Sequence, residues 1–259
     1  MPSRPAPRIL TVRKAWHLTP NMIRVTFAGP ELADFPEGRE GANCKLILPE
    51  PGETREAFAD RLAAGGPTVR RTYTVRHFRA EEQELDIDFV DHGDGGPASA
   101  WAVAAQPGDM LGFAGPGPVK VEHWEADFYL CAADMSAIPV AAATLEAMPR
   151  DAKGLAIFEV TDPADRQEID APEGVEMRWL VHPDPHRPSD AQVELIRTMD
   201  WPEGRVQTCI AGEQSVIRAL RQHLLNERGV ARADAYVSGY WKIGLVEDEH
   251  QQFKKTEAA

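Results

Sequence analysis

The sequence contains no apolar run of the roughly 18 residues that a membrane-spanning helix requires. Its first residues, MPSRPAPRILTVRKAW, also lack the apolar stretch of a signal peptide. Only three cysteines occur, Cys44, Cys131 and Cys209, and they lie far apart without the spacing of metal ligands. These features predict a cytoplasmic protein with buried thiols in a reducing compartment and no metal site.

Positive charge is scarce in this chain of 259 residues. Lys and Arg number 28 against 41 Asp and Glu, so the formal net charge is −13. Most of such a surface repels a polyanion such as DNA, and no basic tail offsets the repulsion. Nucleic acid is therefore not an expected partner.

Two further chemistries lack their motifs. No G-x-S-x-G occurs, so the nucleophile elbow of a hydrolase is missing. His182 and His186 lie four residues apart in HPDPH, but Pro183 and Pro185 prevent the helix that would align them as metal ligands. We interpret this segment as a loop.

The first half of the chain reads as short strands. Up to about residue 122 the apolar pattern alternates, and Pro, Gly and Asn separate the runs. The runs are RILTVRKAWHL, MIRVTFAG, CKLILP, RTYTVRHF, ELDIDFV and DMLGFAGP. This pattern predicts a six-stranded antiparallel β-barrel domain over residues 1–122.

The period changes from about residue 126. The strand-like runs FYLCAA, GLAIFEV, MRWLVH, VQTCIAG and DAYVSGYW alternate with the helix-like segments AIPVAAATLEAMP, SDAQVELIRTMD and EQSVIRALRQHLLNERG. Ser189 is a candidate helix cap, and Gly229 is a candidate helix end. The alternation predicts a parallel α/β sheet of the nucleotide-binding type over residues 123–244, followed by a tail or helix over 245–259.

Positive charge gathers in one segment, RRTYTVRHFR. In an extended strand Arg71, Tyr73 and Val75 share one face, while Thr74 and Arg76 lie on the other. A planar aromatic ligand that carries a phosphate would stack on the tyrosine while the neighbouring guanidinium binds the phosphate. Taken alone, the segment favours the alternative, in which the arginines pair with surface carboxylates.

A second candidate anion site follows in DFVDHGDGGPASAWAVAAQPGD. A strand ends there in a glycine-rich turn, and Pro97 stands at a first helical position. The N–H groups of Ala98, Ser99 and Ala100 would point out of a helix N-terminus, whose partial charge favours a phosphate. An ordinary tight turn is the alternative, since GDGGPAS matches neither G-x-G-x-x-G nor the Walker pattern. Together with the arginine strand, the segment fits the two ends of one diphosphate-bearing flavin.

Four motifs together resemble those of a known family. RTYTVR, HGDGGPASAWA, GPGP and the late SGYWKIG are similar to the siderophore-interacting proteins, which are flavin-containing ferric-siderophore reductases of the ferredoxin reductase superfamily. The resemblance extends from about Arg8 to Gly244 and implies that the barrel binds FAD.

The resemblance also implies roles for individual residues. Arg71 would contact the phosphates, Tyr73 would stack on the isoalloxazine, and Thr74 would hydrogen-bond near the reactive flavin nitrogen. Ideal strand alternation turns Thr74 away from the face of Tyr73, so that contact rests on the resemblance alone. His92, Gly96, Ala98 and Ser99 would hold the pyrophosphate and adenosine portion. The full set of implied FAD-binding residues is Arg71, Tyr73, Thr74, Val75, Arg76, Val90, His92, Gly96, Ala98, Ser99 and Trp241.

The aromatic pair in GYWKIG has two interpretations. Tyr240 or Trp241 packs in the core, or one of them shields the second face of the flavin, for which we choose Trp241.

The second half is expected to bind a nicotinamide dinucleotide. Ligands of open α/β sheets lie beyond the carboxyl ends of the strands, and a bound flavin needs a reductant. The alternative is a sheet that only supports the barrel. The loops at those ends span 132–137, 161–165, 212–214 and 239–241, and the candidate residues are Ala133, Asp134, Ser136, Asp162, Gly212 and Glu213.

Two features bear on how that nucleotide binds. Ala133 stands where the family commonly has glycine, which keeps the backbone farther from a pyrophosphate and weakens binding. Glu159 and Asp162 would bind a ribose diol and repel a 2′-phosphate, which favours NADH over NADPH, whereas Arg166 favours NADPH.

The resemblance implies basic residues that bind an anionic ferric siderophore beside the flavin. Each candidate lysine taken alone is more typical of a solvated surface. The candidates are Lys45, Lys242, Lys254 and Lys255.

The expected activity is transfer of a hydride from NAD(P)H to FAD and of single electrons from FAD to siderophore-bound Fe(III), which releases Fe(II). A general flavin or ferredoxin-type reductase is one alternative, and a ferredoxin is an alternative electron donor. A non-enzymatic, flavin-containing carrier of ferric siderophores is the other.

Overall fold

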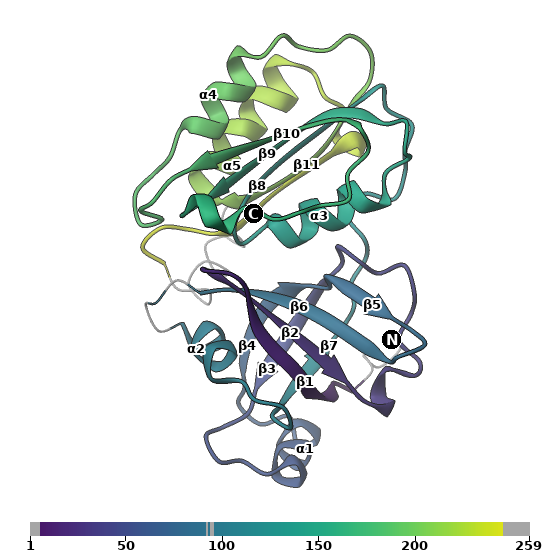
Figure 1. Cartoon of the computed structure of the whole chain (residues 1–259), viewed down its shortest axis with the longest axis vertical. Coiled ribbons are helices and arrows are strands. Elements are labelled where there is room, and N and C mark those ends of the chain that lie inside the picture. The colour runs from purple at the N-terminus through teal and green to yellow at the C-terminus, as the bar shows by residue number, and fades with distance from the viewer. Residues whose placement is uncertain (1–5, 92, 94–95, 246–259) are drawn as a thin grey trace. The chain divides into compact units, whose positions relative to one another are not determined.

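The computed structural model describes residues 6–91, 93 and 96–245. The chain divides into two compact units, Met1–Val119 and Lys120–Ala259, and each is built on its own sheet (Figure 1). No helix within the described ranges is long and apolar enough to cross a membrane. The predictions for His92, Lys254 and Lys255 concern residues outside this part of the chain, as does nearly all of the predicted tail over 245–259.

The first unit is an antiparallel β domain, as predicted. Its seven strands lie in the order β4-β3-β7-β1-β2-β6-β5. The strands are β1 (Arg8–Thr19), β2 (Met22–Ala28), β3 (Asn43–Leu48), β4 (Val69–Thr74), β5 (His77–Arg79), β6 (Glu84–Val90) and β7 (Met110–Ala114), and the helices are η1 (Pro30–Leu32), α1 (Arg55–Ala63) and α2 (Pro97–Ala104).

The seventh strand arises because the run RTYTVRHF forms two strands. β4 pairs with β3 at one edge of the sheet, and β5 pairs with β6 at the other. Between them the Val75 N–H donates to the Ala42 carbonyl at 2.9 Å, and the Arg76 N–H donates to the Asp86 carbonyl at 2.9 Å. The chain thus crosses from edge to edge, which curls the sheet into a barrel-like form that is not closed.

Side chains of β6 alternate between two faces, and both faces are buried. Leu85, Ile87 and Phe89 are fully buried in the hydrophobic core. Asp86 and Asp88 point to the opposite face and are nevertheless only 3% and 4% exposed. Buried carboxylates need partners, and basic side chains supply them here.

The second unit has a parallel sheet, as predicted, in the order β10-β9-β8-β11-β12. Helices α4 and α5 cover one face of it, and α3 lies on the other (Figure 1). The elements are β8 (Phe128–Asp134), α3 (Ile138–Ala147), β9 (Lys153–Val160), η2 (Pro163–Asp165), β10 (Gly174–Val181), α4 (Ala191–Thr198), β11 (Val206–Glu213), α5 (Gln214–Arg221), the π-helical turn η3 (Gln222–Glu227), η4 (Arg232–Asp234) and β12 (Ala235–Trp241).

One predicted helix end is confirmed, and one predicted helix cap differs by a residue. Gly229 follows the η3 turn with φ +71°, the left-handed conformation that glycine tolerates. Ser189, the predicted cap of α4, lies one residue before the actual N-cap, Asp190. The Ser189 hydroxyl donates to the Glu159 carboxylate of β9 at 2.6 Å. It also accepts a long bond of 3.4 Å from the Ala191 N–H at the start of α4.

The three cysteines are free and buried. Burial raises the pKa of the Cys44 thiol, while Cys131 and Cys209 are register partners on β8 and β11. Among the described residues, no group of three or more His, Cys, Asp or Glu side chains is arranged to hold a metal. HPDPH is a loop, as predicted.

Candidate functional site

The inner face of edge strand β4 carries Arg71 and Tyr73. Their cross-strand neighbours on β3, Leu46 and Cys44, are 0% and 1% exposed. Directly opposite residues share a face, yet Arg71 and Tyr73 are only half-buried because no strand pairs with the outer edge of β4. Both side chains can therefore contact a ligand from the core side of the edge strand.

The two predicted parts of the flavin site meet at Phe89. The rings of Tyr73 and Phe89 lie 4.5 Å apart between centroids, and those of Phe89 and Trp101 lie 5.9 Å apart. Trp101 belongs to α2, which packs on β6 and β2. The structure thus brings the arginine strand and the proline-started helix to one part of the unit.

The helix start is where the sequence placed it, with Gly96 as N-cap and Pro97 as first residue. The Ala100 N–H donates to the Gly96 carbonyl at 2.9 Å, so it is not available to a ligand, contrary to expectation. The N–H groups of Ala98 and Ser99 donate to no acceptor among the described residues. The cradle therefore offers two N–H groups rather than three.

Thr74 and Val75 are both buried, at 5% and 0% exposed. The Val75 N–H donates to Ala42, its carbonyl accepts from the Gly41 N–H at 2.9 Å, and its side chain lies in the core. Val75 therefore supports the strand without presenting a side chain to a ligand. Val90, another implied FAD contact, is half-buried at the last position of β6.

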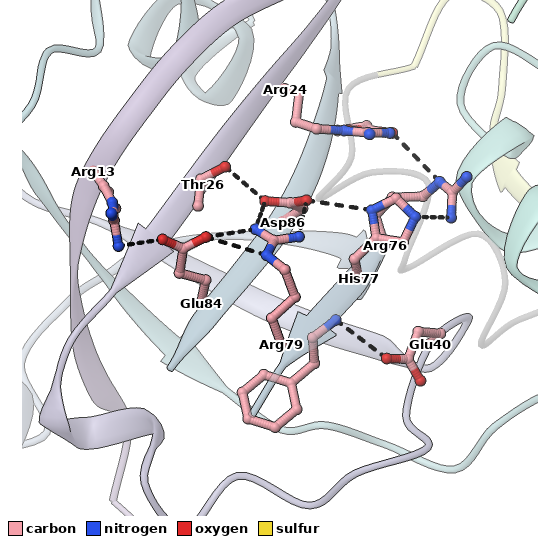
Figure 2. Close-up of polar contacts among 11 residues, drawn as sticks. Arg13, Arg24, Thr26, Glu40, Arg76, His77, Arg79, Glu84 and Asp86 are labelled. Atoms are coloured by element: carbon pink, nitrogen blue, oxygen red, sulfur yellow. Dashed lines mark hydrogen bonds and ion pairs between the residues drawn. The ribbon is translucent and has the colours of Figure 1, made fainter. Parts of the chain in front are cut away.

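Arg76 is buried in a network of charged side chains (Figure 2). Its side chain is 4% exposed; Nη1 lies 2.7 Å from Nε2 of His77, and Nε lies 3.9 Å from Asp88. Arg24 binds the same Asp88 carboxylate through two bonds of 2.6 and 2.7 Å. The charge of Arg76 is balanced inside the unit by Asp88, and Arg76 supports the β4–β5 crossing. Its contact with FAD stays a prediction.

The neighbouring half of the network centres on Asp86 (Figure 2). Thr26 donates to it at 2.6 Å and Arg79 at 2.7 and 2.9 Å. Burial alone would raise the pKa of Asp86, but hydrogen bonds from Arg79, His77 and Thr26 outweigh it and hold the pKa well below its usual range. Since Arg76 donates to Nε2 of His77, Nδ1 carries the proton and donates toward Asp86 at 3.3 Å.

The candidate substrate lysines are not gathered within one unit. Lys45 in the first unit donates to the Thr72 hydroxyl, on the face of β4 opposite Arg71 and Tyr73. Lys242 belongs to the second unit and directly follows β12.

In the second unit, Asp134 at the end of β8 connects several predicted residues. Its carboxylate accepts from the Ser136 N–H and hydroxyl at 2.9 and 2.6 Å, from the Glu213 N–H at 2.8 Å and from the Trp241 indole at 2.7 Å. Burial raises the pKa of Asp134, and these bonds partly oppose the rise. The sheet order reverses between β8 and β11, the place where α/β sheets bind ligands.

Gly212 allows this arrangement. A Cβ atom there would lie 2.6 Å from Oδ2 of Asp134, and the φ of +150° disfavours other residues. Gly239 is similarly confined, because its Cβ would lie 1.8 Å from Oε1 of Gln214. The sequence predicts that both loops lie at the ligand-binding edge of the sheet. It does not show that the Asp134 carboxylate fills the space above Gly212.

Three predicted nucleotide residues have internal partners. Glu213 caps α5 by accepting from the Ser215 N–H at 2.6 Å, which neutralises that helix N-terminus. Ala133 is fully buried, and its carbonyl accepts from Gln192 at 3.1 Å. Exposed Asp162 caps the short η2 helix through the Ala164 N–H at 2.8 Å.

Glu159 is the register partner of Asp134 on β9. Burial raises the pKa of Glu159, and the 2.6 Å bond from Ser189 opposes the rise. Arg166, the nearby residue that favours NADPH, is exposed.

Comparisons with known proteins define the class. An antiparallel β domain followed by this parallel α/β sheet is the ferredoxin reductase-like fold. A ferredoxin NADP+ reductase from Neisseria gonorrhoeae superposes with a TM-score of 0.63 at 19% identity, over 90% of this chain and 96% of that one.

The chain belongs to the siderophore-interacting protein family. The family model "Siderophore-interacting FAD-binding domain" matches residues 11–120, and "Siderophore-interacting protein" matches residues 126–244. Ferric vibriobactin reductase ViuB of Vibrio cholerae is 37% identical over 95% of this chain and 93% of its own. The crystal structure of the siderophore-interacting protein SipS from Aeromonas hydrophila has a TM-score of 0.85 and 34% identity, over 98% of this chain and 99% of that one. The crystal structure of a siderophore utilization protein from T. fusca has a TM-score of 0.81 and 37% identity, over 95% of this chain and 97% of that one.

Proposed function

We propose that this protein is a ferric-siderophore reductase that uses a nicotinamide dinucleotide to reduce siderophore-bound Fe(III). The observation that carries the proposal is the meeting of the Arg71–Tyr73 edge with helix α2 at Phe89, within a segment that matches an FAD-binding family model. Bound FAD would supply the conversion of one two-electron hydride transfer into two single-electron transfers. Hard oxygen ligands hold Fe(II) less tightly than Fe(III), so reduction releases the metal.

The residues of the first unit fit FAD. The half-exposed ring of Tyr73, backed by Phe89, is a flat surface on which an isoalloxazine stacks. Arg71 lies two residues earlier on the same face and binds phosphate oxygens. The Ala98 and Ser99 N–H groups at the start of α2 hold the remaining phosphate charge. Thr74 lies next to Tyr73 and is the candidate for a bond near the reactive flavin nitrogen.

We assign FAD binding to residues 1–122 and nicotinamide-dinucleotide binding to residues 123–244. The division into two units and the separate family matches support this assignment.

The dinucleotide is expected beyond the carboxyl ends of β8 and β11. Glu213 already occupies the N-terminus of α5, whereas the N-terminus of α3 has no side-chain cap and carries Pro139 in its first turn. A pyrophosphate is therefore expected at α3, near Ser136. Glu159 and Asp162 favour NADH over NADPH, and a ferredoxin is the other donor to test.

The substrate is expected to be an anionic ferric siderophore. Lys45 and Lys242 are each candidates to contact it, with Lys254 and Lys255 as further candidates. Local positive charge raises the encounter rate of an anion with a protein of net charge −13.

Stopped-flow absorbance of the FAD-loaded protein tests the proposal. NADH should bleach the flavin band, and a ferric siderophore should restore it faster than buffer does. Bleaching that no ferric chelate reverses would indicate a general flavin reductase. If neither NADH nor NADPH bleaches the band, a ferredoxin or a carrier role replaces this account.

A further inference from the structure

A hollow lined by arginines lies on the second unit, on the sheet face covered by α4 and α5. It measures about 620 Å³ and is lined by Arg197, Ser215, Arg218, Ala219, Arg221, Gln222, Leu225, Asn226 and Arg232. We call it the arginine pocket. Its volume is within the usual range of about 300–1,000 Å³ for small-molecule sites.

The lining carries four guanidinium groups and no carboxylate. Elsewhere in this acidic chain of net charge −13, Arg79 and Arg205, for example, lie 2.7 Å from a carboxylate. Among the residues that the structure describes, no carboxylate lies within salt-bridge distance of Arg197, Arg218 or Arg232. The Glu227 carboxylate lies near enough to Arg197 for the guanidinium to help lower the pKa of Glu227, although it forms no ion pair with Arg197. Like charges held close together repel one another, so the remaining positive charge of the cluster favours an anionic ligand.

The folding of the unit fixes where these side chains lie. Arg218 and Arg221 are one turn apart on α5, whose Ile217 and Leu220 are buried against the sheet. Arg221 donates to the Val237 carbonyl of edge strand β12 at 2.6 Å. Arg232 approaches from η4, just before β12.

Helix ends give a competing explanation for part of the cluster. Arg197 lies in the last turn of α4, and Arg218 and Arg221 lie in the last turn of α5, where positive charge stabilises a helix. That effect does not place Arg232 at the same hollow. It also does not account for the amides of Gln222 and Asn226, which pair with each other at 2.7 Å beside the guanidinium groups.

We propose that the arginine pocket binds a small ligand that carries a pyrophosphate or triphosphate group. Guanidinium forks bind phosphate oxygens through paired hydrogen bonds. Linked phosphates present oxygens in several directions, so groups arriving from α4, α5 and η4 can bind them together, whereas one planar carboxylate suits one fork. The four arginines lie along the flank of α5, at the end of α4 and before β12, away from the carboxyl ends of β8 and β11. Ser215 is the residue of the lining that lies beside the carboxyl end of β11.

Isothermal titration of the FAD-loaded protein with inorganic pyrophosphate tests the proposal, in the presence of saturating NAD+, which occupies the proposed dinucleotide site without reducing the flavin. We expect saturable binding of one pyrophosphate per chain, weakened at least tenfold in the double variant Arg218→Gln with Arg232→Gln. The matched control is Arg150→Gln with Arg178→Gln, which removes equal charge from exposed arginines of the same unit that pair with Asp170 and Glu176. The control should change affinity less than twofold.

Further titrations decide the ligand class. Adenosine triphosphate that binds more tightly than pyrophosphate would indicate a nucleotide, and equal affinity would indicate that only the phosphates are bound; either supports the proposal. Tighter binding of citrate than of pyrophosphate would overturn the phosphate assignment. Absence of saturable binding, or equal weakening in both double variants, would overturn the site itself. Flavin reduction by NADH serves as the folding control, and an unchanged rate in the Arg218→Gln, Arg232→Gln variant would show that this variant remains folded.

Discussion

The indole N–H of Trp241 donates to Oδ2 of Asp134 at 2.7 Å and so connects two strands that are not neighbours. β11 lies between β12 and β8, and the bond passes over its end at Gly212, where a Cβ atom would come within 2.6 Å of the same oxygen. A side chain at Gly212 would thus displace the carboxylate. This relationship holds the carboxyl ends of three strands in one arrangement.

Trp241→Phe should destabilise the protein by about 1.5–3 kcal/mol, because a buried carboxylate loses a hydrogen-bond donor. Urea unfolding measures the difference. Trp179→Phe in the same unit is the control, since Trp179 stacks on Phe158 at 4.6 Å and its indole donates no hydrogen bond among the described residues. Equal losses in both variants would show that the bond to Asp134 contributes nothing beyond packing.

Arg71→Ala should weaken FAD binding roughly 10- to 100-fold, because a charge-assisted bond contributes about 1.5–3 kcal/mol. Fluorescence titration of the apoprotein with FAD measures the affinity. Arg70→Ala removes the same charge from the adjacent residue, whose side chain is exposed and donates to Thr68 at 2.8 Å. Unchanged FAD affinity in Arg71→Ala would remove this residue from the site.

Asp86→Asn should lower the unfolding free energy at neutral pH by about 2–3 kcal/mol, because Arg79 and His77 lose a charged partner. The pKa of Asp86 is lower in the folded than in the unfolded state, so its contribution is present above the usual pKa of 3.8 and is lost as the pH falls through the folded value. The stability gap between wild type and variant should therefore narrow in acid. A gap that does not change with pH would contradict the proposed charge network.

Glu159→Gln should show the opposite dependence. The pKa of Glu159 is raised by burial above its usual 4.5, so the wild-type carboxyl stabilises the fold below that value and loses this contribution as the pH rises through the folded pKa. The variant keeps an acceptor for Ser189 without the charge. It should gain stability relative to wild type as the pH increases from 4 to 7 in urea unfolding, and a constant difference would refute the assignment.

Lys45→Glu combined with Lys242→Glu should slow reduction of an anionic ferric siderophore while leaving flavin reduction by NADH nearly unchanged. Steering of the wild type should weaken as salt shortens the Debye length from about 30 Å at 0.01 M to about 10 Å at 0.1 M. Lys14→Glu with Lys153→Glu supplies the same charge change at exposed positions. If both pairs slow the reaction equally, the two candidate lysines act only through net charge.

The sequence predicted the architecture because its periodicities are strong and consistent. All five strands of the second unit and all three of its helix-like segments occur where the pattern placed them. RTYTVRHF was predicted as one strand because its residues favour strand structure throughout. Its division into β4 and β5 depends on bonds from Val75 to Ala42 and from Arg76 to Asp86, which are distant in sequence.

The candidate site was predictable to the extent that local motifs determine it. The Pro97 helix start and the face shared by Arg71 and Tyr73 follow from short-range rules. The burial of Arg76 and the four bonds to Asp134 depend on which strands become neighbours. A single sequence does not reveal which strands pair, so neither the burial of Arg76 nor the central place of Asp134 among the loops could be predicted from it.

The most direct test of the central claim is the stoichiometry of iron released per NADH consumed under anaerobic conditions. The FAD-loaded protein is mixed with limiting NADH and an excess of ferric siderophore, and Fe(II) is trapped by a coloured chelator. One hydride carries two electrons and each Fe(III) accepts one, so the account predicts two Fe(II) trapped for each NADH oxidised. Oxidation of NADH without trapped Fe(II), or trapped Fe(II) that does not depend on NADH, would contradict it.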